Sequence, residues 1–298
     1  MSAHPSAGVP LTCDVAGIRV VVNGLPPACH RRVADILRPF VVARSDATAD
    51  SSGAAGITAR STAANGPAAH PPLHLWVTRH GPADWCVEGA DAEPVRFGSF
   101  ARVVSHLEWR VVSDALTHSS GPVPLHAGAL ARGEAVVLLV APSENGKTTL
   151  SLGLISRGWE PFADDITLLD PATLRVRAFP RHFHVMPASL GLFSPVPALE
   201  HDPTVWGYAR PLRWAEGSRA PTAIFLVGRD PARPSALEPV TRAELAATLL
   251  RESVRTRLPL GLLASASARL AASVSVCARL NNADLTQALD LIERAALA

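Results

Sequence analysis

The chain has 298 residues, of which 48% are hydrophobic and 18% are charged, a composition typical of folded globular proteins rather than disordered chains. Its formal net charge is +2 and it has no run of Lys or Arg, so nothing in it indicates a nucleic-acid or membrane-binding surface. No secretory signal and no apolar segment of about 18 residues is readable, and the four cysteines lack a paired short spacing. We therefore expect a cytoplasmic protein with no nucleic-acid partner and no membrane partner.

Residues 1–120 are expected to form a small N-terminal α/β region. The stretch 45–72 consists mainly of Ser, Ala, Gly, Thr and Pro, and so few large apolar side chains cannot offset the entropy lost on ordering. We expect this stretch to be a flexible segment. Hydrophobic spacing elsewhere predicts, in chain order, a strand, a helix, two short strands and a helix at 17–22, 29–40, 73–77, 94–97 and 99–118.

Residues 121–298 are expected to form a second, larger α/β domain. Its clearest element is the continuous apolar run 135–140, which is typical of a central strand covered on both faces. A strand at 122–130 precedes this run, and a helix at 148–157 follows it after a short loop. Further strands are expected at 166–169, 174–178 and 223–227, and further helices at 241–252 and 282–297.

The loop after the central strand matches most of the phosphate-binding pattern G-x-x-x-x-G-K-S/T. In that pattern the lysine contacts the β and γ phosphates, and the hydroxyl after it contacts Mg²⁺. Gly146, Lys147 and Thr148 match, whereas Ala141 stands at the first glycine position and is expected to end the strand without a positive φ. An ordinary strand–turn–helix connection is the alternative. We expect ATP and Mg²⁺ to bind at Ala141, Pro142, Ser143, Glu144, Asn145, Gly146, Lys147, Thr148 and Thr149.

The position of the lysine supports this interpretation. Of the 28 basic residues 27 are arginine, and Lys147 is the only lysine in the chain. A compact ammonium on a flexible stem suits a site among phosphate oxygens better than a guanidinium fork does. Biased codon usage can explain an excess of arginine, but it does not explain where the one exception falls.

Other polar residues near the loop in sequence are candidates for chemistry. Asp164 and Asp165 follow the predicted helix, and two adjacent carboxylates are costly unless a cation balances them. One could hold Mg²⁺ while the other accepts a proton from an attacking hydroxyl; a solvated turn is the alternative. His126 is expected on the strand before the central one, and His182 with His184 gives a weak metal signal.

Residues 125–170 resemble the C-terminal catalytic domain of HPr kinase/phosphorylase and of the smaller related serine kinases of bacterial gene clusters. The resemblance implies a P-loop-containing, PEP-carboxykinase-like α/β fold. It also implies a reaction centre formed by His126, Lys147 and Asp165, with Thr148, Asp164 and Asp165 at the metal. The segment "AFPRHFHV" at 178–185 resembles the smaller kinases, which makes Arg181 a candidate phosphate contact.

The expected activity is therefore transfer of the γ-phosphoryl group of ATP to a serine-type hydroxyl of a peptide or small protein. Two alternatives stay open. One is a kinase of a small-molecule alcohol, such as a sugar, an amino acid or a natural-product intermediate. The other is a nucleotide-binding regulator without turnover, although a pure binder needs neither His126 nor Asp165. The sequence leaves the oligomeric state open, a homo-oligomer included.

Overall fold

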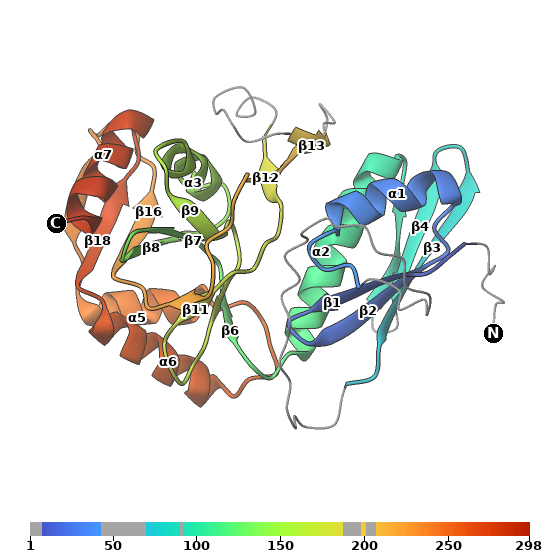
Figure 1. Ribbon diagram of the computed structural model, residues 1–298, viewed down its shortest axis with the longest axis horizontal. Coiled ribbons are helices and arrows are strands. Elements are labelled where there is room, and N and C mark those ends of the chain that lie inside the picture. Colours follow the sequence, from blue (N-terminus) through green and yellow to red (C-terminus); the bar gives the residue numbers. More distant parts are fainter. Residues whose placement is uncertain (1–7, 43–69, 90–91, 187–197, 201–206) are drawn as a thin grey trace, which may run out of the picture. The chain divides into compact units, whose positions relative to one another are not determined.

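The computed structural model describes residues 8–42, 70–89, 92–186, 198–200 and 207–298. Within these residues the chain is a mixed α/β protein with two compact units, Met1–His118 and Ser119–Ala298 (Figure 1). Most of the segment expected to be flexible, 45–72, lies outside the described residues. The described part contains no helix that is long and apolar enough to cross a membrane.

The first unit is built on one sheet with the strand order β1-β2-β3-β4-β5. Only the pair β2 and β3 is parallel, and the neighbours on either side are antiparallel hairpins. The strands are β1 (Leu11–Val15), β2 (Ile18–Asn23), β3 (Leu73–Gly81), β4 (Asp84–Gly89) and β5 (Ala92–Phe97). Alternating buried residues of β1 and β2 form a core with the helices α1 (Pro27–Ile36) and α2 (Phe100–His118).

The second unit contains a six-stranded sheet with the order β17-β18-β16-β8-β7-β9. Its strands are β7 (Ala127–Arg132), β8 (Ala135–Val140), β9 (Glu160–Ala163), β16 (Ala223–Gly228), β17 (Ala236–Pro239) and β18 (Val276–Asn281). The expected central strand is β8, which is parallel to β16 and antiparallel to β7. Because β18 is also parallel to β16, the three strands β8, β16 and β18 have their carboxyl ends on the same edge of the sheet.

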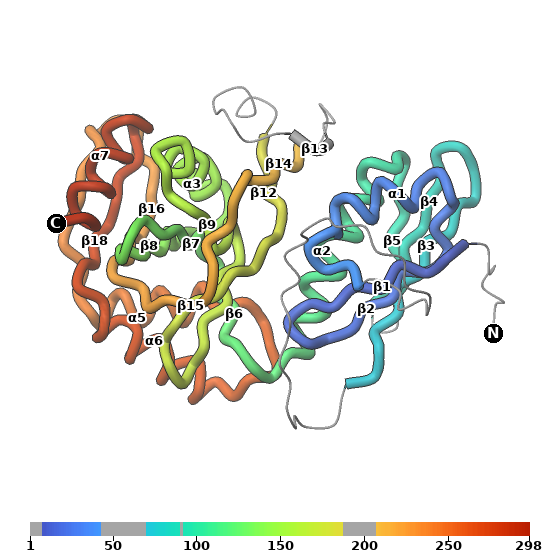
Figure 2. Tube along the Cα trace, viewed as in Figure 1, coloured from blue at the N-terminus to red at the C-terminus, as the bar shows by residue number. Residues whose placement is uncertain are grey.

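Helices cover this sheet on both sides. The helices α3 (Lys147–Ser156) and α7 (Leu285–Ala296) contact each other and share one apolar core with β8, β16 and β18. The helices α5 (Arg242–Arg251) and α6 (Leu260–Ser273) pack together on the other side, as Figures 1 and 2 show. The sequence analysis missed α6 and β18. The Ala- and Ser-rich stretch of α6 gave a weak periodic pattern, and the polar Arg279 and Asn281 interrupt the apolar pattern of β18.

The strand expected at 122–130 is two strands in different sheets. β6 (Val123–Leu125) joins the four-stranded sheet β15-β11-β10-β6, whereas β7 belongs to the six-stranded sheet. His126 lies between β6 and β7, not within a strand. The other strands of that sheet are β10 (Thr167–Leu169), β11 (Val176–Arg177) and β15 (Ser218–Arg219). Three further short strands form a separate sheet: β12 (Phe183–Val185), β13 (Ala198–Glu200) and β14 (Gly207–Ala209).

Candidate active site

The loop between β8 and α3 has a backbone that only certain residues accept easily. Gly146 caps α3 with a φ of 86°, and a Cβ there would lie 2.9 Å from the amide nitrogen Nδ2 of Asn282. Glu144 also has a positive φ, 67°, which is unusual for a residue with a side chain. Ala141 is buried and has no positive φ. The alanine at the first glycine position therefore causes no backbone strain, as expected, and the unusual residue of the loop is Glu144.

Lys147 begins α3 and its ammonium group points back beneath the loop. Its Nζ donates to the carbonyl oxygens of Ala141 at 2.8 Å and Pro142 at 3.1 Å, and lies 3.1 Å from Nε2 of His126. Only 5% of its side chain is exposed. Burial lowers the pKa of Lys147, and the charges of Asp165, Asp164 and Glu252 oppose that effect. The positive charge is thus held in a confined place among acceptors.

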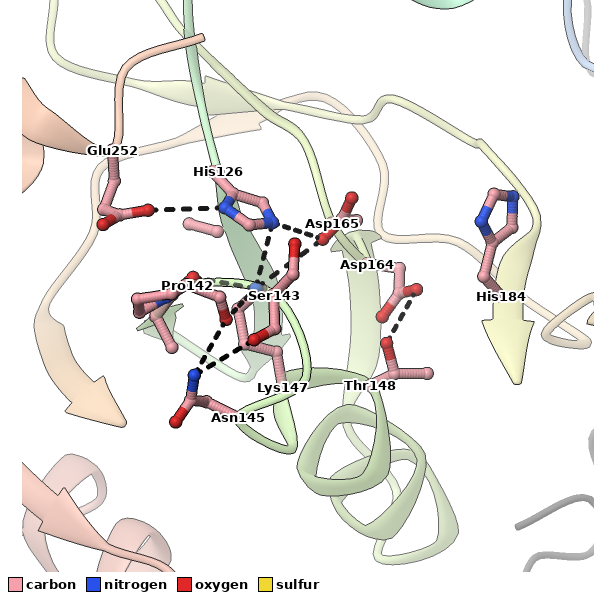
Figure 3. A network of polar contacts seen from close by, with 12 residues as sticks. His126, Pro142, Ser143, Asn145, Lys147, Thr148, Asp164, Asp165, His184 and Glu252 are labelled. Atoms are coloured by element: carbon pink, nitrogen blue, oxygen red, sulfur yellow. Dashed lines mark hydrogen bonds and ion pairs between the residues drawn. The ribbon is translucent and has the colours of Figure 1, made fainter. Parts of the chain in front are cut away.

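His126 lies between two carboxylates (Figure 3). Its Nε2 is 2.9 Å from Oδ1 of Asp165, and its Nδ1 is 3.3 Å from Oε2 of Glu252. Asp165 lies in the loop between β9 and β10, and Glu252 is the C-cap residue of α5. Together, β6, β9 and α5 bring to one point three side chains that are far apart in sequence.

Asp165 lies beside His126 and two positive groups. Besides His126, it has Nζ of Lys147 at 3.7 Å from Oδ1 and Nη1 of Arg181 at 3.5 Å from Oδ2. Burial acts to raise the pKa of Asp165, but the hydrogen bond from His126 and the charges of Arg181, His126 and Lys147 together hold it well below its usual range. This carboxylate is therefore charged at neutral pH.

Asp164 has the opposite environment. It is only 3% exposed, its Oδ2 accepts a hydrogen bond from Thr148 Oγ1 at 3.2 Å, and its buried Oδ1 has no hydrogen-bond partner. Burial, followed by the charge of Asp165, raises the pKa of Asp164 to about 7. A buried carboxylate oxygen without a donor is costly unless a cation or water satisfies it. The pair of Thr148 and Asp164 therefore fits a hard divalent cation such as Mg²⁺, which prefers oxygen ligands.

The remaining predicted residues lie around this centre. Asn145 donates from Nδ2 to the carbonyl oxygens of Pro142 at 3.4 Å and Ser143 at 3.1 Å, which closes the loop on itself. Ser143 is exposed and Thr149 is half-buried in the first turn of α3. His184, of the weak His-x-His signal, lies 3.5 Å from Arg181, measured between His184 Nε2 and Arg181 Nη2.

Within the described residues, no three His, Cys, Asp or Glu side chains are arranged to hold a metal ion by themselves. A cation that binds together with phosphate needs fewer protein ligands, because one or two carboxylates and phosphate oxygens suffice for Mg²⁺. The Thr148 and Asp164 pair meets that smaller requirement.

Two residues of the site were missed by the sequence analysis. Glu252 lies 126 residues after His126 and has no motif around it. Asn282 follows β18, a strand that was not predicted, and its amide reaches the loop at Gly146. Both come from the end of the chain, where only the three-dimensional fold brings them to the loop.

No protein-family model and no curated protein sequence matches the chain. The geometry of the site and the resemblance of residues 125–170 therefore carry the functional proposal.

Proposed function

We propose that the second unit is an HPr-kinase-like, PEP-carboxykinase-like P-loop domain. We further propose that it transfers the γ-phosphoryl group of ATP to a serine-type hydroxyl of a peptide or small protein. One observation carries the proposal: His126, Lys147 and Asp165, spread over 39 residues, meet within 3.7 Å of one another beside a buried Asp164. A protein that only binds nucleotide has no need of this second group of residues beyond the loop.

The fold around the site supports the P-loop part of the proposal. A buried strand, a loop with Gly146 at a positive φ, and a helix that begins at Lys147 follow one another directly. The loop lies at the carboxyl ends of the parallel strands β8, β16 and β18, the edge at which open α/β sheets bind ligands. The first turn of α3 adds backbone N–H groups and the positive end of a helix dipole.

Each charged group then has a distinct role. Lys147 and the loop amides would hold the β and γ phosphates, and Arg181 would contact the transferred group. Thr148 and Asp164, with Asp165 beside them, would hold Mg²⁺, which neutralises charge on the phosphate oxygens when bound. His126 lies beside both Lys147 and Asp165 and would hold these two side chains in place relative to each other.

Asp165 would accept the proton of the acceptor. The hydroxyl oxygen forms a bond to the γ phosphorus, the bond from that phosphorus to the bridging oxygen breaks, ADP leaves, and the hydroxyl proton passes to Asp165. Its low pKa makes Asp165 a weak base. A weak base is adequate here because the transition state of phosphoryl transfer is loose, so the hydroxyl needs orientation more than early deprotonation.

Two variants test these roles separately. Lys147→Ala should weaken MgATP binding at least tenfold, measured by isothermal titration calorimetry, because it removes the only ammonium among the phosphates. Asp165→Asn should leave affinity within a few fold but lower γ-³²P transfer by at least a hundredfold. Asp170→Asn is the matched control, because Asp170 accepts hydrogen bonds within its own turn, from the backbone N–H groups of Ala172 and Thr173 and from the Thr173 side chain.

The acceptor is tested with the wild-type chain and two sets of substrates. One set contains serine-bearing peptides, and the other contains free sugars and amino acids. Label in the peptides supports the proposal, and label only in the metabolites replaces it with a small-molecule kinase. Unchanged MgATP affinity in Lys147→Ala would overturn the nucleotide site itself.

A further inference from the structure

Glu252 is attached to His126 twice. The backbone N–H of His126 donates to the carbonyl oxygen of Glu252 at 2.7 Å, and the side chains meet at 3.3 Å between Nδ1 and Oε2. Next to this pair Leu125 pairs with Ser253, and one residue further along the N–H of Val254 donates to the carbonyl oxygen of Pro124 at 2.8 Å. The segment 252–254 thus pairs with residues 124–126 as a short antiparallel ladder beside β6. The direction of the Glu252 side chain is therefore fixed by backbone pairing.

The two nitrogens of His126 have different neighbours. A carboxylate only accepts hydrogen bonds, so Glu252 can bond to Nδ1 only when Nδ1 carries a proton. Nε2 faces two groups of opposite kind: the ammonium of Lys147, which only donates, at 3.1 Å, and the carboxylate of Asp165, which only accepts, at 2.9 Å. Nε2 can bond to one of them at a time, and in either case Nδ1 keeps its proton.

We propose that Glu252 is a positioning residue that excludes the tautomer of His126 with a bare Nδ1, so that Nε2 is the nitrogen presented to Lys147 and Asp165. The lone pair of Nε2 is then available to Lys147 when the ring is neutral. Only 12% of the Glu252 side chain is exposed, so water competes little for the bond to Nδ1. A second-sphere carboxylate that selects a histidine tautomer is an established device of catalytic sites.

The consequence for catalysis rests on the proposed function. Without Glu252, the single proton of the neutral ring would lie on Nε2, and this N–H would donate a hydrogen bond to Asp165. Asp165 would then be less available to the acceptor hydroxyl, and Lys147 would lose one of its three acceptors. We expect Glu252→Ala to lower kcat by about tenfold to a hundredfold, with the KM for MgATP within about threefold, because the loop and its phosphate contacts are untouched.

The direct test is ¹⁵N NMR of the histidine rings in the full chain, at a pH well above the ordinary titration range of histidine. The His126 signals are assigned by their loss in His126→Asn. The wild type should show the proton on Nδ1, and Glu252→Ala should show it on Nε2. Glu252→Gln offers Nδ1 an NH2 donor as well as an acceptor oxygen, so it should no longer exclude the tautomer with a bare Nδ1, and its kcat should lie between those of the wild type and Glu252→Ala.

Glu244→Ala is the control on the same helix, because Glu244 is at the surface, where it pairs with Arg279. A proton on Nε2 in the wild type, or on Nδ1 in Glu252→Ala, would overturn the proposal. The spectra need no turnover, so they decide it even if no acceptor is phosphorylated, an outcome that would overturn the kinase function alone. A changed tautomer with unchanged kcat would refute the positioning role.

Discussion

Replacing Gly128 by alanine should displace the carboxylates of Asp164 and Asp165, because Gly128 lies against the backbone of Asp164. Gly128 lies in β7, and a Cβ built there would be 2.8 Å from the backbone oxygen of Asp164 and 3.0 Å from Oγ of Ser151. A carbon and a carbonyl oxygen in contact ordinarily lie about 3.3 Å or more apart, so one of them must move by about 0.5 Å. Ser151 can rotate its hydroxyl, whose Oγ is buried without a partner. The backbone of Asp164 has no such freedom, so we expect the carboxylate pair to move.

The size of the effect follows from two opposing contributions. Overpacking of a buried site costs about 1–3 kcal/mol, and the loss of glycine flexibility in the unfolded chain returns about 0.4–1 kcal/mol. The difference between the two ranges is a net loss of about 0–2.6 kcal/mol with a centre near 1 kcal/mol, and that centre corresponds to a Tm lower by about 2–4 °C for a domain of this size. Because small displacements of reacting groups are costly, transfer should fall by about tenfold or more.

The assay is thermal unfolding followed by circular dichroism, together with γ-³²P transfer by the folded variant. Gly261→Ala is the matched control: Gly261 is exposed in the first turn of α6 and nothing lies within 4 Å of an added Cβ. It should raise stability slightly, by about 0.5–1 kcal/mol, because alanine favours the helix. Wild-type Tm and wild-type transfer in Gly128→Ala would refute the close approach of β7 to Asp164.

Two further predictions concern charge at the site. Folding raises the pKa of Asp164 from 3.8 to about 7, so its charge opposes folding increasingly from about pH 4 to pH 7 and constantly above. Asp164→Asn should therefore be more stable than the wild type by on the order of 1–4 kcal/mol in urea at pH 8 without Mg²⁺, but not at pH 4; a gain independent of pH would contradict this. Glu144 is exposed at a φ of 67°. Glu144→Gln should tighten MgATP binding about two- to fivefold at low salt and less at high salt, and Glu144→Gly should tighten it further; equal effects at both salt concentrations would exclude a charge effect.

The fold was predictable where local sequence decides it. The run 135–140 could only be a buried strand, and the glycine, lysine and hydroxyl after it could only suit the start of a helix. The hydrophobic pattern could not show where a strand is interrupted. It predicts one strand over 122–130. The chain instead leaves one sheet and enters another at His126, because Leu125 pairs with Thr167 and Ala127 with Val140. Such pairings depend on distant strands and not on local sequence.

The candidate site shows the same division. Asp164, Asp165 and Lys147 are joined by one short helix and strand, so their closeness follows from the spacing that a strand–helix–strand unit requires. Glu252, at the end of α5, contacts His126, and Asn282, directly after β18, lies beside the loop, and no spacing rule relates either to Lys147. Glu144 could be noted as acidic in the sequence, but its positive φ could be learned only from the backbone.

The confinement of Lys147 has a practical chemical meaning. Its ammonium is the only side-chain amine in the chain, and its side chain is 5% exposed. Apart from a terminal α-amine, amine-directed acylating reagents therefore have one amine target, and its burial should make that reaction slow. The rate of labelling would measure how often Lys147 becomes accessible. Slower labelling in the presence of a nucleotide would report that the nucleotide occupies the site at Lys147, without any engineered probe.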